Sequence, residues 1–230
     1  MKETIYTIPL NEALDEDTEC MFCVLEKKLE KEQIEYALGP AMMEPDYRIL
    51  SNEKGYCRHH LEKLIKSHRA LPFALVQDTR IDEIIKNLTD VNQKKAKKKT
   101  ELMVKVLDEM TKSCIVCDRI NATMEKFIDT FWYLYKREPD FRKRILNGKG
   151  FCVHHFADIL KSVQKNAGLK REEYTCELLE LEISSLKKIK EDVHDFTKQF
   201  DYRCGGKMKE GLENAHIVCG EKLSKYCEKD

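Results

Sequence analysis

The sequence predicts an all-α protein, built from a duplicated helical unit followed by a long C-terminal helix. The 230 residues include only 9 glycines and 5 prolines, a composition that favours helices over sheets. Apolar residues recur at steps of three and four along several segments, and no segment shows the alternation typical of a strand. Three short motifs also occur twice, in the same order and at nearly constant spacing. Such self-similarity indicates an internal duplication.

The repeated motifs give each half of the chain the same plan. Cys20-Met-Phe-Cys23 matches Cys114-Ile-Val-Cys117, and Glu44-Pro-Asp-Tyr-Arg48 matches Glu138-Pro-Asp-Phe-Arg142, both at an offset of 94 residues. Gly55-Tyr-Cys57-Arg-His-His60 matches Gly150-Phe-Cys152-Val-His-His155 at an offset of 95. In each half, a cysteine pair is expected to open a helix, a proline to break or restart it, and the third cysteine to begin a second helix.

Apolar spacing predicts the remaining helices. One is expected around residues 81–88 and another around 102–110, after the lysine-rich run at 94–99. A stripe at steps of three and four predicts a long amphipathic C-terminal helix; its members are Leu179, Ile183, Leu186, Ile189, Val193, Phe196 and Phe200. We expect this stripe to pack across both repeats or against a second subunit. The predicted divisions are 1–93, 94–168 and 169–230, forming one compact unit.

The ten cysteines point to metal chemistry. The first residues carry no long apolar stretch, and no window approaches the ~18 apolar residues that a membrane span needs. We therefore expect a cytoplasmic protein without membrane contact. In a reducing compartment, organised cysteines indicate metal or redox sites rather than structural disulfides.

Each repeat offers three thiolates and two adjacent histidines, and helical geometry favours one histidine over the other. If a helix begins at the third cysteine, residue i+3 shares its face while i+2 points away. The predicted metal ligands are therefore Cys20, Cys23, Cys57 and His60 for one site, and Cys114, Cys117, Cys152 and His155 for the other. His59 and His154 remain alternatives, or partners that orient a ligand. Gly55 and Gly150 are expected to supply unusual backbone angles just before the third ligand.

Zinc is the ion that this donor set favours, at two ions per chain. Structural zinc takes four thiolate or imidazole ligands in a tetrahedron. Free buried thiols, a thioredoxin-type pair and an iron–sulfur site are the competing interpretations. The duplication disfavours the first, the absence of a βαβ pattern the second, and the histidine in each set the third. Because four protein ligands leave no open position, the sites are expected to be structural rather than catalytic.

Other candidate groups are weaker. Cys176, Cys204, Cys219 and Cys227 lie outside the repeated motifs, and Cys204, His216, Cys219 and Cys227 offer a possible third metal site. The repeated acid-plus-arginine block at 44–48 and 138–142 is expected to serve as a helix cap and salt bridge. Lys and Arg equal Asp and Glu at 41 each, so the overall charge gives no attraction to nucleic acid.

Taken together, these motifs resemble those of a bacterial family of unknown function, found mainly in Firmicutes. The resemblance includes the Thr-Ile-Pro segment near the N-terminus and Phe-Asp-Tyr-Arg at 200–203. Members of that family are sometimes labelled automatically as ABC transporter substrate-binding proteins. The resemblance implies the duplicated ligand pattern and a cytoplasmic location, and it supplies no activity. The cysteine-rich C-terminus departs from it.

The function that the sequence predicts is a non-enzymatic zinc-binding scaffold. Closed metal sites, balanced charge and a long apolar helical stripe favour a protein that binds an unknown protein partner or forms a homodimer. The alternative is a thiol/zinc redox sensor or metal-handling protein, which three thiolates per site permit. No activated nucleophile, phosphate-binding loop or carboxylate pair indicates an enzyme.

Overall fold

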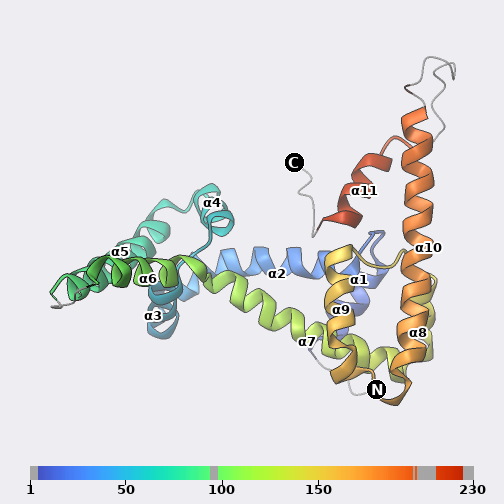
Figure 1. Cartoon of the computed structure of the whole chain (residues 1–230), viewed down its shortest axis with the longest axis horizontal. Coiled ribbons are helices and arrows are strands. Elements are labelled where there is room, and N and C mark those ends of the chain that lie inside the picture. The colour runs from blue at the N-terminus through green and yellow to red at the C-terminus, as the bar shows by residue number, and fades with distance from the viewer. Residues whose placement is uncertain (1–4, 94–97, 199, 201–210, 225–230) are drawn as a thin grey trace. The chain divides into compact units, whose positions relative to one another are not determined.

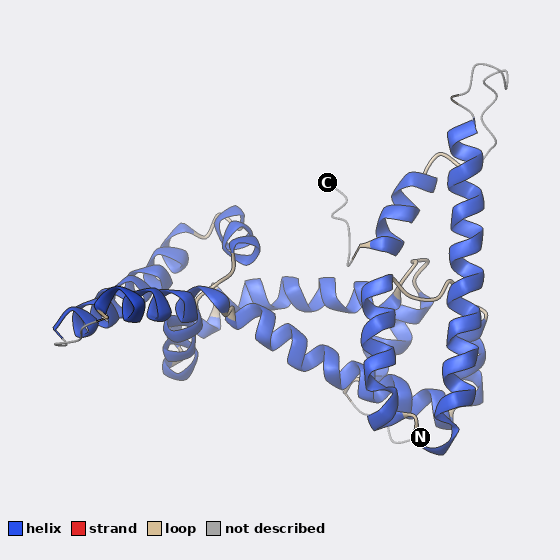
Figure 2. Cartoon of the chain, in the orientation of Figure 1, coloured by secondary structure: helices blue, strands red, loops and turns tan. Residues whose placement is uncertain are grey.

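The computed structural model describes residues 5–93, 98–198, 200 and 211–224. Within these ranges the regular elements are all helices, and no strand is present, as Figure 2 shows. The all-α prediction is therefore confirmed for the described residues. None of the described helices combines the length and the apolar character needed to cross a membrane.

The chain divides into two compact units whose boundaries cut across the predicted ones. The first unit contains residues 1–26 and 124–230, and the second contains residues 27–123. The boundaries fall inside the two long helices that follow the cysteine pairs, α2 (Met21–Ala37) and α7 (Ile115–Arg137). These boundaries differ from the predicted divisions after residues 93 and 168. The repeats are consecutive in sequence, but each unit draws helices from both.

The helices follow one another in the same order in each repeat (Figure 1). Long helices α2 and α7 are followed by α3 (Pro45–Lys54) and α8 (Pro139–Leu146), which begin at the repeated prolines. Proline suits this position because the first helical N–H has no partner in the helix. Next come α4 (Arg58–Lys66) and α9 (Val153–Asn166), which begin directly after the third cysteines. These helix starts confirm the predicted plan.

The long C-terminal helix belongs to the duplication and is not an addition to it. It is α10 (Arg171–Lys198), and its counterpart in the first repeat is α5 (Ala70–Gln93). Three buried positions match at an offset of 98 residues: Val76 with Tyr174, Arg80 with Leu178, and Val91 with Ile189. Each of these helices packs against a following helix, α6 (Lys99–Lys112) or α11 (Ala215–Leu223). The remaining elements are α1 (Thr7–Asp15) and short 3-10 turns at Pro40–Met43 and Gly168–Lys170.

The first unit is held together by an aromatic core. Phe22, Phe131 and Phe151 are fully buried, with ring centroids 5.8–5.9 Å apart in each pair. Trp132 and Tyr135 pack against Phe131 from the same helix, α7. Helix α10 completes this core with Tyr174 and Leu178, and large buried rings of this kind dominate core energetics.

The repeated arginines tie neighbouring helices together within each unit. Arg142 on α8 pairs with Glu173 and Glu177 on α10, and its guanidinium lies 4.8 Å from the Tyr174 ring centroid. Arg48 on α3 donates instead to Leu75 O and Thr79 Oγ1 on α5, at 3.2 and 3.0 Å. The block therefore has a packing role in both repeats, although its acidic members make no side-chain cap at the helix start.

The predicted apolar stripe of α10 is only partly buried. Ile189 is buried, but Leu179 and Ile183 are exposed. The buried face runs instead through Tyr174, Leu178, Glu182 and Ile189. At 100° per residue this face lies roughly a third of a turn from Leu179 and Ile183. Because a glutamate stands in its centre, hydrophobic spacing alone placed the buried face wrongly.

Glu182 is buried because it forms an ion pair with Lys222. Their side chains are 4% and 0% exposed, and Nζ lies 3.1 Å from Oε1. Lys222 Nζ also donates to Lys149 O at 2.8 Å, while Glu182 Oε2 accepts from Phe151 N at 3.0 Å. The pair therefore joins α10 and α11 to the turn that leads into Cys152.

Replacing Lys222 with alanine should strongly destabilise the first unit. The change leaves the Glu182 carboxylate buried without a cation, which typically costs about 3–5 kcal/mol in the free energy of unfolding. Chemical denaturation of the two proteins measures this difference. A combined Glu182→Leu and Lys222→Met variant should lose less, because no charge stays buried alone. Lys187→Ala, at an exposed position on α10, is the control, and an unfolding midpoint for Lys222→Ala equal to that of the control would contradict the buried-pair interpretation.

Candidate metal centres

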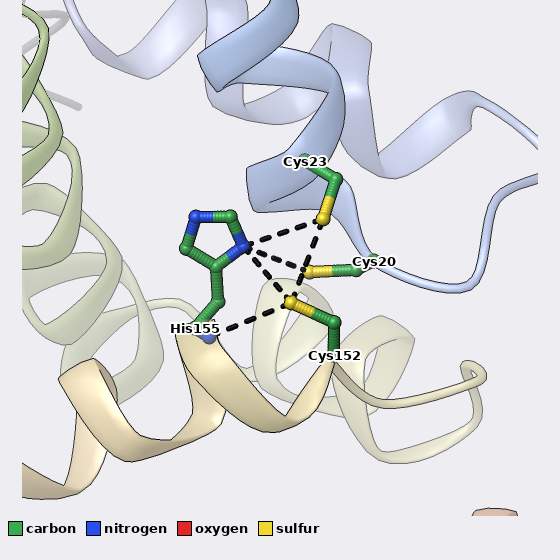
Figure 3. Close-up of side chains that lie close together, drawn as sticks. All are labelled: Cys20, Cys23, Cys152 and His155. Atoms are coloured by element: carbon green, nitrogen blue, oxygen red, sulfur yellow. Dashed lines mark hydrogen bonds between the residues drawn. The ribbon is translucent and has the colours of Figure 1, made fainter. Parts of the chain in front are cut away.

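The first cluster lies in the first unit and consists of Cys20, Cys23, Cys152 and His155. One donor atom from each residue lies within 4.8 Å of all the others. Nδ1 of His155 is 3.5, 3.4 and 3.3 Å from the sulfurs of Cys20, Cys23 and Cys152. Figure 3 draws these contacts as dashed lines. Three sulfurs and one ring nitrogen thus converge on one point, as a tetrahedral metal site requires.

The second cluster lies in the second unit and consists of Cys57, His60, Cys114 and Cys117. Nδ1 of His60 is 3.2 Å from the sulfur of Cys57 and 3.3 Å from the sulfurs of both Cys114 and Cys117. The same donor set occurs as in the first cluster, with the same ring nitrogen facing the sulfurs. The two clusters could each hold a metal ion.

The structure brings together all eight predicted residues but pairs them differently from the prediction. We expected each repeat to build its own site; instead, the cysteine pair of one repeat meets the third cysteine and the histidine of the other. The predicted pairings of Cys20 and Cys23 with Cys57 and His60, and of Cys114 and Cys117 with Cys152 and His155, are wrong. Spacing alone could not reveal this, because both repeats carry the same motifs. Either pairing gives each site three cysteines and one histidine.

Helix length and local contacts explain the exchange. Helix α2 has 17 residues, so it carries the chain about 25 Å away from its own cysteine pair. In the second unit, Ile115 N donates to Gly55 O at 3.1 Å and Ser113 Oγ donates to Lys54 O at 3.0 Å. These bonds hold the second cysteine pair against the turn that precedes Cys57.

The first unit uses an ion pair for the same purpose. Lys149, just before the turn that leads to Cys152, lies 2.7 Å from Asp17 and 3.1 Å from Glu19. These acids precede Cys20 in the sequence. The turn and the cysteine pair are therefore held together by charges outside the cluster.

The turn before each third cysteine requires glycine, as predicted. Gly55 and Gly150 have φ values of 66° and 82°, in the region that disfavours other residues. Space is also limited: a Cβ on Gly55 would lie 3.0 Å from Arg80 Nη2, and one on Gly150 would lie 2.6 Å from Glu182 Oε2. A buried charged side chain therefore fills the position beside each glycine.

The orientation of the histidines agrees with the helical argument. His60 and His155 are buried and aim Nδ1 at the sulfurs. His59 instead places Nε2 2.7 Å from Glu30, and His154 is exposed. Neither alternative histidine belongs to a three-cysteine cluster. Whether the two buried histidines bind a metal stays a prediction.

Two buried glutamates on α2 complete the surroundings of the histidines. Glu26 lies 3.4 Å from Nε2 of His155 in the first unit, and Glu30 lies 3.1 Å from Nε2 of His60 in the second. A carboxylate on the far nitrogen fixes the ring's tautomer and orientation for metal binding by the near one. Sequence reasoning missed both residues. Their spacing from Cys23, at i+3 and i+7, places them on its helical face and was the available signal.

Glu30, His59 and His60 also lie close enough together to be considered as a separate metal group. Lys63, however, places Nζ 2.6 Å from Oε2 of the same glutamate. The ammonium group already neutralises the carboxylate, and a second cation here would be repelled. Hydrogen bonds from His60, Lys63 and His59 hold the pKa of Glu30 well below its ordinary value despite burial. We therefore assign this group to the support of the second cluster.

Without a metal, the donors share protons among themselves. Burial acts to lower the pKa of His155, but hydrogen bonds to Cys152 and Cys20 outweigh it and raise the pKa to about 11. For His60, bonds to Cys114 and Glu30 outweigh burial in the same way, and its pKa rises to about 10. The pKa of Cys114 falls to about 6 because its bond to His60 outweighs burial. These shifts favour the protonated form of both histidines, and a metal ion must displace that proton to bind.

The chain belongs to the family of unknown function DUF6062. The family model matches residues 1–230, the whole chain. No curated protein and no solved structure matches it. The family assignment agrees with the expected resemblance to a family of unknown function and assigns no activity, so the clusters themselves must support any proposal for this DUF6062 chain.

The possible third site falls partly outside the described residues. Cys204 and Cys227 lie there. His216 stacks on Phe196 with ring centroids 5.3 Å apart, Cys219 is half-buried on α11, and Cys176 is exposed on α10. The third-site prediction therefore stays a prediction.

The exchanged pairing can be tested by counting metals in double variants. Cys20→Ala with Cys152→Ala damages only the first cluster, so one metal ion per chain should remain. Cys20→Ala with Cys57→Ala damages both clusters and should leave none after dialysis against a chelator. Native mass spectrometry gives the count. The opposite result, with none for the first variant and one for the second, would support pairing within each repeat.

The two adjacent histidines should differ in their effect on the second cluster. His60→Ala removes a donor that faces three sulfurs and should abolish metal binding there. His59→Ala removes only a bond to Glu30 and should weaken affinity by about tenfold to a hundredfold, as partners outside the ligand set do. Competition with a colorimetric chelator measures both, and His154→Ala is the control at the equivalent exposed position. Loss of the metal in His59→Ala alone would overturn the ligand assignment.

Proposed function

We propose that this protein is a non-enzymatic helical scaffold held together by two zinc ions. The observation that carries the proposal is the convergence of three sulfurs and one Nδ1 in each cluster. Soft thiolates favour zinc over magnesium or calcium, and a mixed sulfur and nitrogen set in a tetrahedron is typical of structural zinc. Glu30 and Glu26, which lie against the far ring nitrogens of His60 and His155, also support metal binding because a carboxylate there fixes the orientation of the ring.

The structural role follows from where the ligands come from. Each cluster joins a cysteine pair to a turn more than 120 residues away in the first unit and more than 50 away in the second. Zinc binding would offset the entropy of bringing such distant segments together, so its binding free energy contributes to folding. Four protein ligands at each ion leave no position for substrate, which supports the proposal that neither ion is catalytic.

A protein partner is the class of ligand that we propose for the scaffold. Helices α5 and α10 expose apolar side chains at equivalent positions, Ile81 and Ile85 in one repeat and Leu179 and Ile183 in the other. Single exposed apolar residues are common on protein surfaces. The repetition of the same pair on the same helical face supports its use in binding.

Elemental analysis should find about two zinc ions per chain in protein purified without chelators. Removing them should lower the unfolding temperature, because metal affinity and folding are coupled. Mass spectrometry under native conditions and thermal unfolding, with and without chelator, measure both effects. Protein that is metal-free as purified and gains no stability from added zinc would refute the proposal.

A further inference from the structure

The two clusters share a donor set but differ in how well their ligands are shielded. In the first cluster Cys20, Cys152 and His155 are 2%, 0% and 2% exposed, and only Cys23 is partly exposed. In the second cluster two ligands, Cys57 and Cys117, are partly exposed. A metal bound in the second cluster would therefore present two thiolates to water and to other ligands.

The packing around the two clusters also shields the first cluster better than the second. Phe22 lies between the cysteines of the first pair and Phe151 precedes Cys152, and both rings are fully buried. The His155 ring lies 5.8 Å from that of Phe22. The first cluster is therefore embedded in the aromatic core on both sides. Opening it would expose large apolar surface, at roughly 25 cal/mol per Å².

The equivalent positions in the second cluster carry a smaller and a more polar residue. Val116 replaces Phe22, and Tyr56, which is only half-buried, replaces Phe151. The nearest ring to His60 is that of its neighbour His59, 5.2 Å away. On the far side of His60, Glu30 is held by Lys63 and by the half-exposed His59. Water can reach the supporting groups of this cluster.

Helix α6, which leads into the second cysteine pair, is weakly held. It contains 14 residues and none of them is buried. A segment with few buried apolar contacts opens locally at low free-energy cost. Such opening would release the bond from Ser113 to Lys54 O, one of the two bonds that hold the second cysteine pair against the turn before Cys57.

We propose that the second cluster is an exchangeable zinc site, from which the protein gives up zinc to a competing set of thiolate or imidazole ligands, while the first cluster keeps its ion. This proposal rests on the proposed zinc binding. An entering thiolate bonds to the zinc as the thiolate of Cys57 or Cys117 leaves and takes up a proton from water. The zinc stays divalent and no electron is transferred. The protein would then be a zinc donor with one permanent and one transferable ion.

The test uses the full-length chain loaded with two zinc ions and exposed to EDTA for increasing times. Each sample is quenched with N-ethylmaleimide, its metal count is read by native mass spectrometry, and its labelled cysteines are mapped by peptide mass spectrometry. We expect a one-zinc species to accumulate, labelled at Cys57, Cys114 and Cys117 and protected at Cys20, Cys23 and Cys152. The exposed Cys176 should be labelled at all times and reports that the reagent is active.

Two single-site variants test, without cysteine labelling, whether the second cluster is the one that releases its ion faster. Cys20→Ala leaves the second cluster, and its ion should be lost about tenfold faster than the ion that remains in Cys57→Ala, because local opening precedes release. Simultaneous loss of both ions, equal rates in the two variants, or earlier labelling of the first cluster would each overturn the proposal. Protein that never holds zinc would instead refute the proposed zinc binding, so the two failures are distinguishable.

Discussion

The convergence of four donors from two distant segments is the constraint on which each unit depends. In the first unit, α2 begins and α9 begins at the same cluster, although their first residues are more than 130 positions apart in the sequence. In the second unit, α4 and α7 meet in the same way. Other residues of each unit hold the four donors in place. Glycine turns present the third cysteine, neighbouring side chains hold the turn, and glutamates orient the histidines.

Much of this arrangement could be predicted from residue type and spacing. Helical periodicity gave the fold class, proline and the third cysteines gave the helix starts, and the i+3 relation selected His60 and His155 over their neighbours. The pairing of the half-sites could not be obtained this way. Two identical motifs contain no local signal for which partner each one meets, and that choice is made by helix length and by contacts such as those of Lys149 and Ser113. Glu182 was missed for a related reason, because its burial depends on Lys222, 40 positions later in the chain.

The two clusters differ in the residues that pack against their ligands. The ligands and the glycines are the same in both, whereas the residues packed against them are aromatic in the first unit and smaller or polar in the second. A duplication that only needed two equal structural sites would be satisfied by the same packing twice. The difference in shielding therefore gives the second cluster a property that the first lacks, namely access for other ligands.

A buried cation lies beside each glycine turn, and the two units supply it from different residues. In the first unit the cation beside Gly150 is Lys222, supplied by α11 and paired with Glu182. In the second unit it is Arg80, supplied by α5, which donates to Met110 O at 2.9 Å. The guanidinium stays charged even though burial lowers its pKa. Lys222 Nζ contacts the Glu182 carboxylate and donates to Lys149 O in the turn. Arg80 instead donates to the backbone carbonyl of Met110 near the end of α6. Arg80 thereby links the turn before Cys57 to the helix that leads into Cys114, and opening of α6 would break that link at the same time as it separates the ligands.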